Sequence, residues 1–252
     1  MMEITPADAE RMLKLNDGNR PFNKHHVAVL AREMKMGRWK VNGDTICLSG
    51  TRLIDGQHRL MAIIESGCTI ETLVVDGVAA DVFDTKDVGR RRSASDTLAI
   101  RGEANTSNLA AALAVIDRYM TSRLTVTVRY TNTEIEELLG KYPDVRPSVI
   151  KGAYTKKLAP NSIVTACHYL FAQKDASLAD WFVECLIDGK NLTEGSPVYV
   201  LRERLLTNAL SKAKLRSIYL MALIIKAWNA TRLSAKVRVL KFAEDEAFPV
   251  VQ

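Results

Sequence analysis

Asp55-Gly-Gln-His-Arg59 joins a short apolar run of strand type, residues 51–54, to a run with apolar residues at helical spacing, residues 57–66. A helix therefore begins within this stretch, and the first backbone N–H groups of a helix have no partner inside it. These donors and the helix dipole favour an anion. The stretch therefore predicts a phosphate-binding site at the connection between the strand and the helix. A plain strand-to-helix turn, in which the aspartate caps the helix and the histidine and arginine are solvated, is the alternative.

The residues of this stretch, called the DGQHR motif below, suit contact with phosphate. Gly56 lets the backbone approach a ligand closely, and Arg59 offers a forked cation for bidentate contact. His58 can donate to a phosphate, in a contact that would depend on pH because imidazole titrates near neutrality. Asp55 either binds Mg²⁺ or acts as a base in phosphoryl transfer, or it caps the following helix.

The charge of the chain favours a polyanionic partner such as DNA. The 252 residues include 35 Lys and Arg against 29 Asp and Glu, which gives a formal charge of +6 and an isoelectric point near 9.1. The densest basic run is Arg90-Arg-Arg92, which precedes Ser93 and Ser95 and suits contact with a phosphate backbone. A solvated loop before a helix is the alternative interpretation of this run.

Cysteine spacing and hydropathy limit the classes of protein to which this chain can belong. The four cysteines, at positions 47, 68, 167 and 185, form no CxxC pair, so the sequence predicts neither a zinc site nor a disulfide framework. The first residues lack the basic and apolar regions of a signal peptide. The longest apolar run, residues 218–225, is far shorter than the roughly 20 residues of a membrane span. We therefore expect a cytoplasmic protein with no membrane partner.

Turn and capping signals predict an α+β arrangement for the first hundred residues. Thr5 and Ser93 are expected helix caps. His25 and His26, at a helix start, are interpreted as surface residues, with a place at the site as the alternative. Glu33, on the polar face of the same helix, is interpreted as a solvated charge. The expected elements are a helix opening at Thr5, a helix over about 23–37, strands over 45–48 and 51–54, a helix over 57–66, strands over 70–75 and 78–83, and a helix over 93–102.

After about residue 100, few stretches of the sequence have a pattern typical of β-strands. Trp181, Phe182 and Trp228 lie on apolar helix faces, which places them in the expected core. The basic segment 229–241 alternates in hydropathy and is expected as a terminal strand or arm. We predict an α+β domain over residues 1–102 and an all-helical domain over residues 103–252. The expected helices of the second domain cover residues 108–120, 133–139, 161–173, 178–187, 199–213 and 215–230.

The first domain resembles the ParB/sulfiredoxin superfamily, and within it the ParB-like proteins with a DGQHR motif that occur in phages and mobile elements. The resemblance covers about residues 15–100. Asn19-Arg-Pro-Phe22 is similar to the segment that opens ParB domains. Residues 53–62 stand where ParB proteins carry a Gly-Glu-Arg-Arg box and sulfiredoxins a Gly-Cys-His-Arg box. The resemblance implies that fold, with a small mixed sheet, in a bacterial or phage-infected cell.

The same resemblance implies that the DGQHR motif holds the phosphates of a nucleotide, ATP or CTP, together with Mg²⁺. Residues 56–59 would then bind the nucleotide, and Asp55 would bind the metal or act as the base. Gln57 stands in the place of the sulfiredoxin cysteine, which excludes thiol chemistry. A later ParB box, Glu-Asn-x-x-Arg, is matched loosely by residues 87–91, so the resemblance places Arg90 and Arg91 near the nucleotide.

Two classes of function follow from these observations. In the first, a nucleotide-binding ParB-like protein hydrolyses or transfers phosphate from an NTP in a DNA-associated process, as a kinase of a modified DNA base or as an NTP-gated DNA clamp. Arg90, Arg91 and Arg92 would supply a second cationic wall and contact DNA. In the second, a non-catalytic DNA-binding or regulatory protein uses the same basic pocket for nucleic acid backbone. The sequence leaves open whether the chain forms a homodimer.

Overall fold

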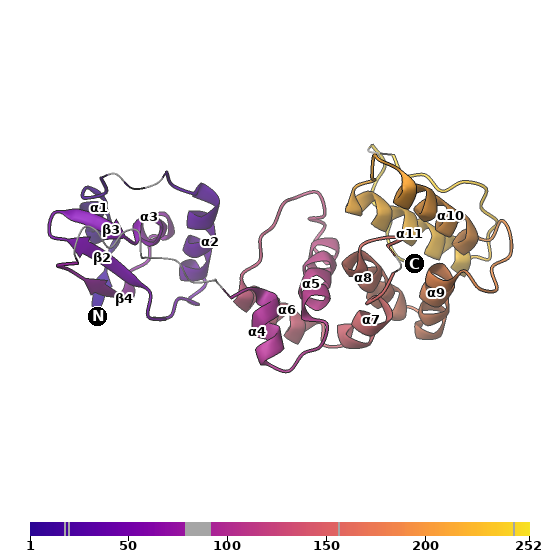
Figure 1. Ribbon diagram of the computed structural model, residues 1–252, viewed down its shortest axis with the longest axis horizontal. Coiled ribbons are helices and arrows are strands. Elements are labelled where there is room, and N and C mark those ends of the chain that lie inside the picture. The colour runs from indigo at the N-terminus through magenta and orange to yellow at the C-terminus, as the bar shows by residue number, and fades with distance from the viewer. Residues whose placement is uncertain (18, 20, 79–91, 156, 244) are drawn as a thin grey trace. The chain divides into compact units, whose positions relative to one another are not determined.

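The chain forms two compact units, Met1–Arg90 and Arg91–Gln252 (Figure 1). The computed structural model describes residues 1–17, 19, 21–78, 92–155, 157–243 and 245–252. The division falls earlier than the expected boundary after residue 102. The reason is that the helix α4 (Ala94–Ile100) buries Leu98 in the core of the second unit.

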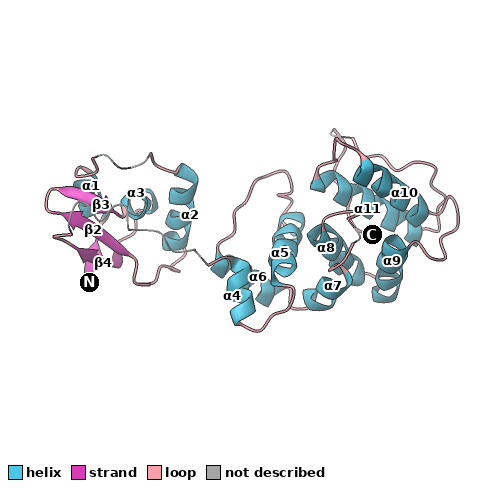
Figure 2. Ribbon diagram, viewed as in Figure 1, coloured by secondary structure: helices cyan, strands magenta, loops and turns pink. Residues whose placement is uncertain are grey.

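The first unit is a small α+β domain, as the sequence predicts. Its four strands form one mixed sheet in the order β1-β4-β2-β3, in which β4 pairs parallel with β2 and the two other pairs are antiparallel. The crossover between β2 and β4 runs through the β3 hairpin strand and α3 (Figure 2). The elements are β1 (Met2–Ile4), α1 (Pro6–Leu13), α2 (Lys24–Lys35), β2 (Thr45–Ser49), β3 (Arg52–Asp55), α3 (Gln57–Ser66) and β4 (Ile70–Val75).

Local signals in the sequence account for the ends of these helices. Thr5 and Asp8 form a capping box around the start of α1, with Pro6 as its first residue. Asn23 caps α2 by accepting the N–H of His26. Gly67 ends α3 in the left-handed region, with φ of 71°. All of these ends agree with the prediction to within about two residues.

The core of the first unit gathers around α3, which contacts both α1 and α2 (Figure 1). Its apolar side chains pack against the sheet together with those of the neighbouring helices, and this burial supplies the main stabilising free energy of a domain this small. The fully buried members include Ile4, Ala9, Ile46, Leu53, Leu60, Ala62 and Ile63.

The second unit is helical, and no strand occurs among its described residues (Figure 2). Its core contains Phe171 stacked on Trp228 at 4.3 Å between ring centroids, with Phe182 edge-on to both. Nowhere in the described chain is a helix long and apolar enough to cross a membrane. After α4, the helices are α5 (Thr106–Met120), α6 (Asn132–Lys141), α7 (Val145–Lys151), α8 (Asn161–Ala172), α9 (Ala176–Asp188), α10 (Pro197–Leu210) and α11 (Ser217–Arg232).

Several expectations about the elements were wrong or incomplete. Strand β1 and helix α7 are not among the elements predicted from the sequence. Segment 229–241 was expected as a terminal strand or as an arm packed on the body, and it is not a strand. The second alternative agrees with the structure: α11 continues to Arg232, and the irregular chain that follows packs Leu240 and Phe242 into the core. Trp181 was expected in the core, but 41% of its surface is exposed. Of the strand expected over residues 78–83, only Val78 lies within the described residues.

Candidate functional site

The helix α3 opens with a glycine that no other residue could replace without strain. Gly56 is the N-cap residue, with φ of 106°, and it makes no side-chain capping hydrogen bond. A Cβ atom at this position would lie 3.1 Å from the Cα of Ile46, a fully buried residue of β2. Two independent constraints, backbone conformation and close approach to β2, therefore require glycine here.

Asp55 is the last residue of β3, and its carboxylate contacts the backbone of the next residue. The Oδ1 atom accepts the N–H of Gly56 at 2.7 Å. The alternative in which Asp55 is the N-cap of α3 is therefore wrong, since Gly56 occupies that position. The carboxylate lies beside the positive end of the α3 dipole, where a negative charge is stabilised.

Gln57 is buried and holds the loop that precedes α2. Its Oε1 atom accepts from Nδ2 of Asn16 at 3.2 Å. Asn16 in turn accepts from Nδ2 of Asn19, which also donates to the backbone carbonyl of Leu53 at 2.7 Å. Gln57 thus belongs to a polar cluster with Asn16 and Asn19 of the loop, because buried amide groups need partners.

His58 is 9% exposed and joins the same loop. Its Nε2 atom accepts the backbone N–H of Asn23 at 3.0 Å. The ring packs against those of Phe22 and His26, at 5.9 and 5.5 Å between centroids. Since Nε2 accepts a hydrogen bond, only Nδ1 could donate to a phosphate. His26, interpreted from the sequence as a surface residue, instead belongs to this site.

Arg59 points toward β2. Its guanidinium donates to the backbone carbonyl of Thr45, and it lies 3.5 Å from a carboxylate oxygen of Asp44. The side chain is 16% exposed. These contacts connect α3 to the start of β2. To bind a phosphate, the Arg59 side chain would have to give them up.

Of the predicted second cationic wall, Arg92 alone lies among the described residues. Arg90 and Arg91 lie outside the described residues. Arg92 is exposed in the second unit, before α4, and its backbone carbonyl accepts from Nδ2 of Asn132 at 3.0 Å. Residues 55–59 are thus the part of the predicted site that the structure places together.

The donors near the motif fit a Mg²⁺ ion only in part. Among the described residues, no group of three or more His, Cys, Asp or Glu side chains could hold a metal ion. Mg²⁺ is commonly held by one or two carboxylates together with substrate phosphates. Asp55 could supply one such carboxylate, and the nucleotide would have to bring the phosphate oxygens.

Glu33 of α2 forms an ion pair with Arg38, which the sequence did not predict. Glu33 was interpreted as a solvated charge, but it accepts from Arg38 at 2.7 and 3.2 Å, with both side chains about one-seventh exposed or less. The chain reverses at Gly37, which brings Arg38 back to Glu33. A glycine stop followed by a basic residue was the available signal.

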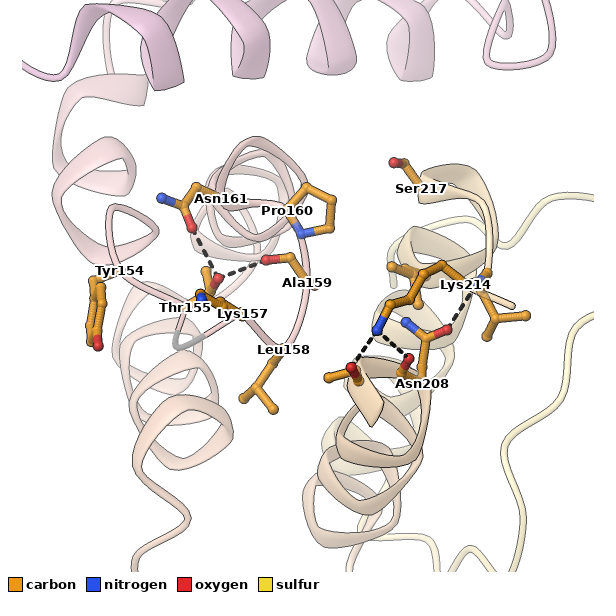
Figure 3. Close-up of a pocket in the computed structure, with 13 residues that line it drawn as sticks. Tyr154, Thr155, Lys157, Leu158, Ala159, Pro160, Asn161, Asn208, Lys214 and Ser217 are labelled. Atoms are coloured by element: carbon orange, nitrogen blue, oxygen red, sulfur yellow. Dashed lines mark hydrogen bonds between the residues drawn. The ribbon is translucent and has the colours of Figure 1, made fainter. Parts of the chain in front are cut away.

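The second unit holds a cavity of about 490 Å³ that the sequence did not indicate (Figure 3). Lys157 and Lys214 are its lining cations. Lys214 donates to the backbone carbonyls of Asn208 and Ala209 at the end of α10, and so it completes that helix end. The hydroxyl of Thr155 is likewise directed to protein atoms. These contacts give Lys214 and Thr155 structural roles.

Positive charge is concentrated in the second unit. Residues 91–252 contain 23 of the 35 Lys and Arg but only 16 of the 29 Asp and Glu, whereas residues 1–90 contain 12 and 13. The excess of seven positive charges therefore lies wholly outside the domain that carries the DGQHR motif.

No family model, curated protein or solved structure matches the chain significantly. The ParB-like assignment therefore stays a hypothesis that rests on the motif and its neighbouring segments.

Proposed function

We propose that this chain is a ParB-like, DNA-associated nucleotide-binding protein. The first unit takes the phosphates of an NTP at the start of α3, and the basic second unit contacts DNA backbone. Hydrolysis or transfer of the terminal phosphate is the reaction that such a site would support.

The observation that carries the proposal is the start of α3. A helix of ten residues opens with Gly56, which makes no side-chain cap, and it has no acidic residue in its first turn. Backbone donors and the helix dipole at such an end favour a phosphate. The missing side chain of Gly56 makes room for Ile46 of β2, so the glycine lets this helix end pack closely on the sheet.

The side chains of the motif have different roles in this proposal. Gln57 and His58 position the loop before α2 next to the helix end. Asp55 would share a Mg²⁺ ion with the nucleotide phosphates or accept a proton from the attacking hydroxyl. Arg59 is already held by protein oxygens, so we assign it a positioning role for α3.

Variants of two aspartates with similar local structure, Asp55 and Asp76, test the nucleotide site. Asp55 and Asp76 both accept the N–H of the following glycine at 2.7 Å, and both glycines have positive φ, but only Asp55 precedes a helix. Thermal unfolding would be measured with ATP, CTP and GTP, each with and without Mg²⁺. A nucleotide at 100 times its Kd should raise the free energy of unfolding by about 2.7 kcal/mol.

The two variants should respond differently. Asp55→Asn should lose the contribution of Mg²⁺ to nucleotide binding, while Asp76→Asn should behave as the unmodified protein. If no nucleotide stabilises the protein, the proposal fails. If both variants bind Mg²⁺-nucleotide alike, Asp55 does not share the metal ion with the nucleotide.

A second candidate is a non-catalytic DNA-binding or regulatory protein. The charge distribution favours it, since the positive excess lies outside the unit that carries the motif. Release of inorganic phosphate from bound NTP separates the candidates: turnover that Asp55→Asn abolishes supports the enzyme, and DNA binding without turnover supports the second candidate.

A further inference from the structure

An exposed tryptophan stands out on α9. Trp181 exposes 41% of its surface, whereas Trp228 is fully buried and the adjacent Phe182 is in the core. A large aromatic ring that is left in contact with water keeps apolar surface available for a ligand.

Trp181 lines a cavity of about 450 Å³. The walls come from α9, from the segment 193–198 at the start of α10, and from the end of α11 with the chain that follows it. This volume lies within the range of sites that bind small molecules or single nucleotides. The charged side chains of the lining are Glu194, Lys236 and Arg238.

The two cations of this cavity are available for a ligand. Both Lys236 and Arg238 are exposed, and neither forms an ion pair with any other residue that the structure describes. They belong to the segment 204–243, which contains nine Lys and Arg and no Asp or Glu. The side of the cavity that this segment forms therefore attracts a polyanion.

We propose that this cavity binds single-stranded nucleic acid, with an unpaired base stacked on Trp181 and adjacent phosphates on Lys236 and Arg238. Proteins that bind single strands combine aromatic stacking platforms with a cationic groove. A base pair within a duplex is covered on both faces, so only an unpaired base can reach the indole. The inference rests on the proposed DNA association but not on the α3 site, and it specifies the form of the nucleic acid and the place where it binds.

The test is fluorescence anisotropy of end-labelled oligothymidylate and oligouridylate with the full chain. Trp181→Ala should weaken binding by roughly 5- to 150-fold, the loss expected for one base stack, while Trp181→Phe should retain most of the affinity. Lys236→Glu with Arg238→Glu should weaken binding and make it less sensitive to salt. The two oligonucleotides distinguish DNA from RNA as the source of the strand.

A matched charge control uses Lys174→Glu with Lys190→Glu. Both lysines are exposed in the same unit, and neither lines the cavity. This variant changes the net charge equally and should bind more tightly than the cavity variant. Equal weakening by the two charge variants would overturn the proposal, because the attraction would then be general. Unchanged affinity in both Trp181 variants, or no binding of either oligonucleotide, would overturn it as well.

The oligonucleotide-binding test can fail or succeed independently of the test of the nucleotide site at α3. Asp55→Asn should leave oligonucleotide affinity unchanged, and Trp181→Ala should leave nucleotide stabilisation unchanged. Failure of one test therefore leaves the other interpretable. The charge variant alters only exposed side chains, so it keeps the inference testable even if Trp181→Ala lowers the yield of folded protein.

Discussion

The backbone N–H of Asn23 donates to Nε2 of His58 at 3.0 Å, so a side chain in the first turn of α3 holds the residue that caps α2. The side chain of Asn23 in turn accepts the N–H of His26, whose ring packs on that of His58. The starts of the two helices are thereby fastened to each other. The DGQHR motif is a structural joint as well as a candidate phosphate site.

Replacing His58 should loosen both helix starts. In His58→Ala the N–H of Asn23 loses its acceptor and the packed ring is removed, so we expect a loss of about 2–4 kcal/mol in the free energy of unfolding. Chemical denaturation measures the loss, and amide exchange at Asn23 should accelerate. His25→Ala, at an exposed position of the same helix, should stay within about 0.5 kcal/mol of the unmodified protein. Similar losses in both variants would contradict the role of this hydrogen bond.

Gly56 and Gly67, which lie at the two ends of α3, provide a second prediction. Gly56→Ala should lower the free energy of unfolding by about 2–4 kcal/mol, because strain at φ of 106° adds to the collision with Ile46. Gly67→Ala should lower it by only about 1 kcal/mol, since φ is 71° there but no atom lies within 4 Å of a Cβ. Denaturation of both variants gives the comparison, and equal losses would show that the approach to β2 is not tight.

The sequence predicted most helix ends because these depend on residues close together in the chain. Thr5, Asn23 and Ser93 cap helices through their own side chains, and Gly67 adopts the left-handed conformation that a helix end favours. The α+β class of the first unit followed from the alternation of such elements. Strand β1 was missed because three residues carry little periodicity, and they form a strand only by pairing with β4.

Side-chain roles at the site were less predictable because they depend on distant partners. The motif suggested that Arg59 faces a phosphate, but its partner Thr45 is fixed by the pairing of β2 with β4. Helix α7 was missed because Pro147 lowers helix propensity, although proline is tolerated within the first turn. The exposure of Trp181 could not be read from periodicity, which marks an apolar face without showing how much of it is covered.

A glycine at the end of α7 provides the third prediction. A Cβ on Gly152 would lie 2.1 Å from Oγ1 of Thr165 and 2.7 Å from its backbone nitrogen, so α7 and α8 approach closely there. Gly152→Ala should lower the free energy of unfolding by about 3 kcal/mol. Gly140→Ala, within α6 and with open space around it, should instead raise it by about 0.5–1 kcal/mol. Opposite signs in denaturation experiments would confirm the contrast, and a neutral Gly152→Ala would contradict it.

The last prediction concerns pH and the buried imidazole of His168. Its Nδ1 atom lies 2.9 Å from the hydroxyl of Ser148 on α7, and its Nε2 atom lies 2.8 Å from the carboxylate of Asp180 on α9. Lys151 pairs with Asp180 and with Glu184, so both signs of charge face the ring. Burial lowers the pKa of His168 below its ordinary value, and the attraction of Asp180 only partly offsets this effect.

The sign of the pH effect follows from this lowered pKa. Above the unfolded pKa of about 6.5 the histidine is neutral in both states and the protein has its full stability. As the pH falls below that value the unfolded chain takes up the proton first, so the free energy of unfolding decreases until the folded ring is protonated as well. Asp180 does not change the stability in this pH range, because its hydrogen bond with Lys151 lowers the pKa of this carboxyl from its already acidic ordinary value.

Thermal unfolding between pH 7.5 and 5.0 measures the effect. The melting temperature of the unmodified protein should fall across this range, and the fall should be smaller in His168→Gln, which can still hydrogen bond but cannot titrate. His25→Gln, at an exposed position of the first unit, should keep the full dependence on pH. A His168→Gln protein with the same pH dependence as the unmodified protein would show that another group controls acid stability.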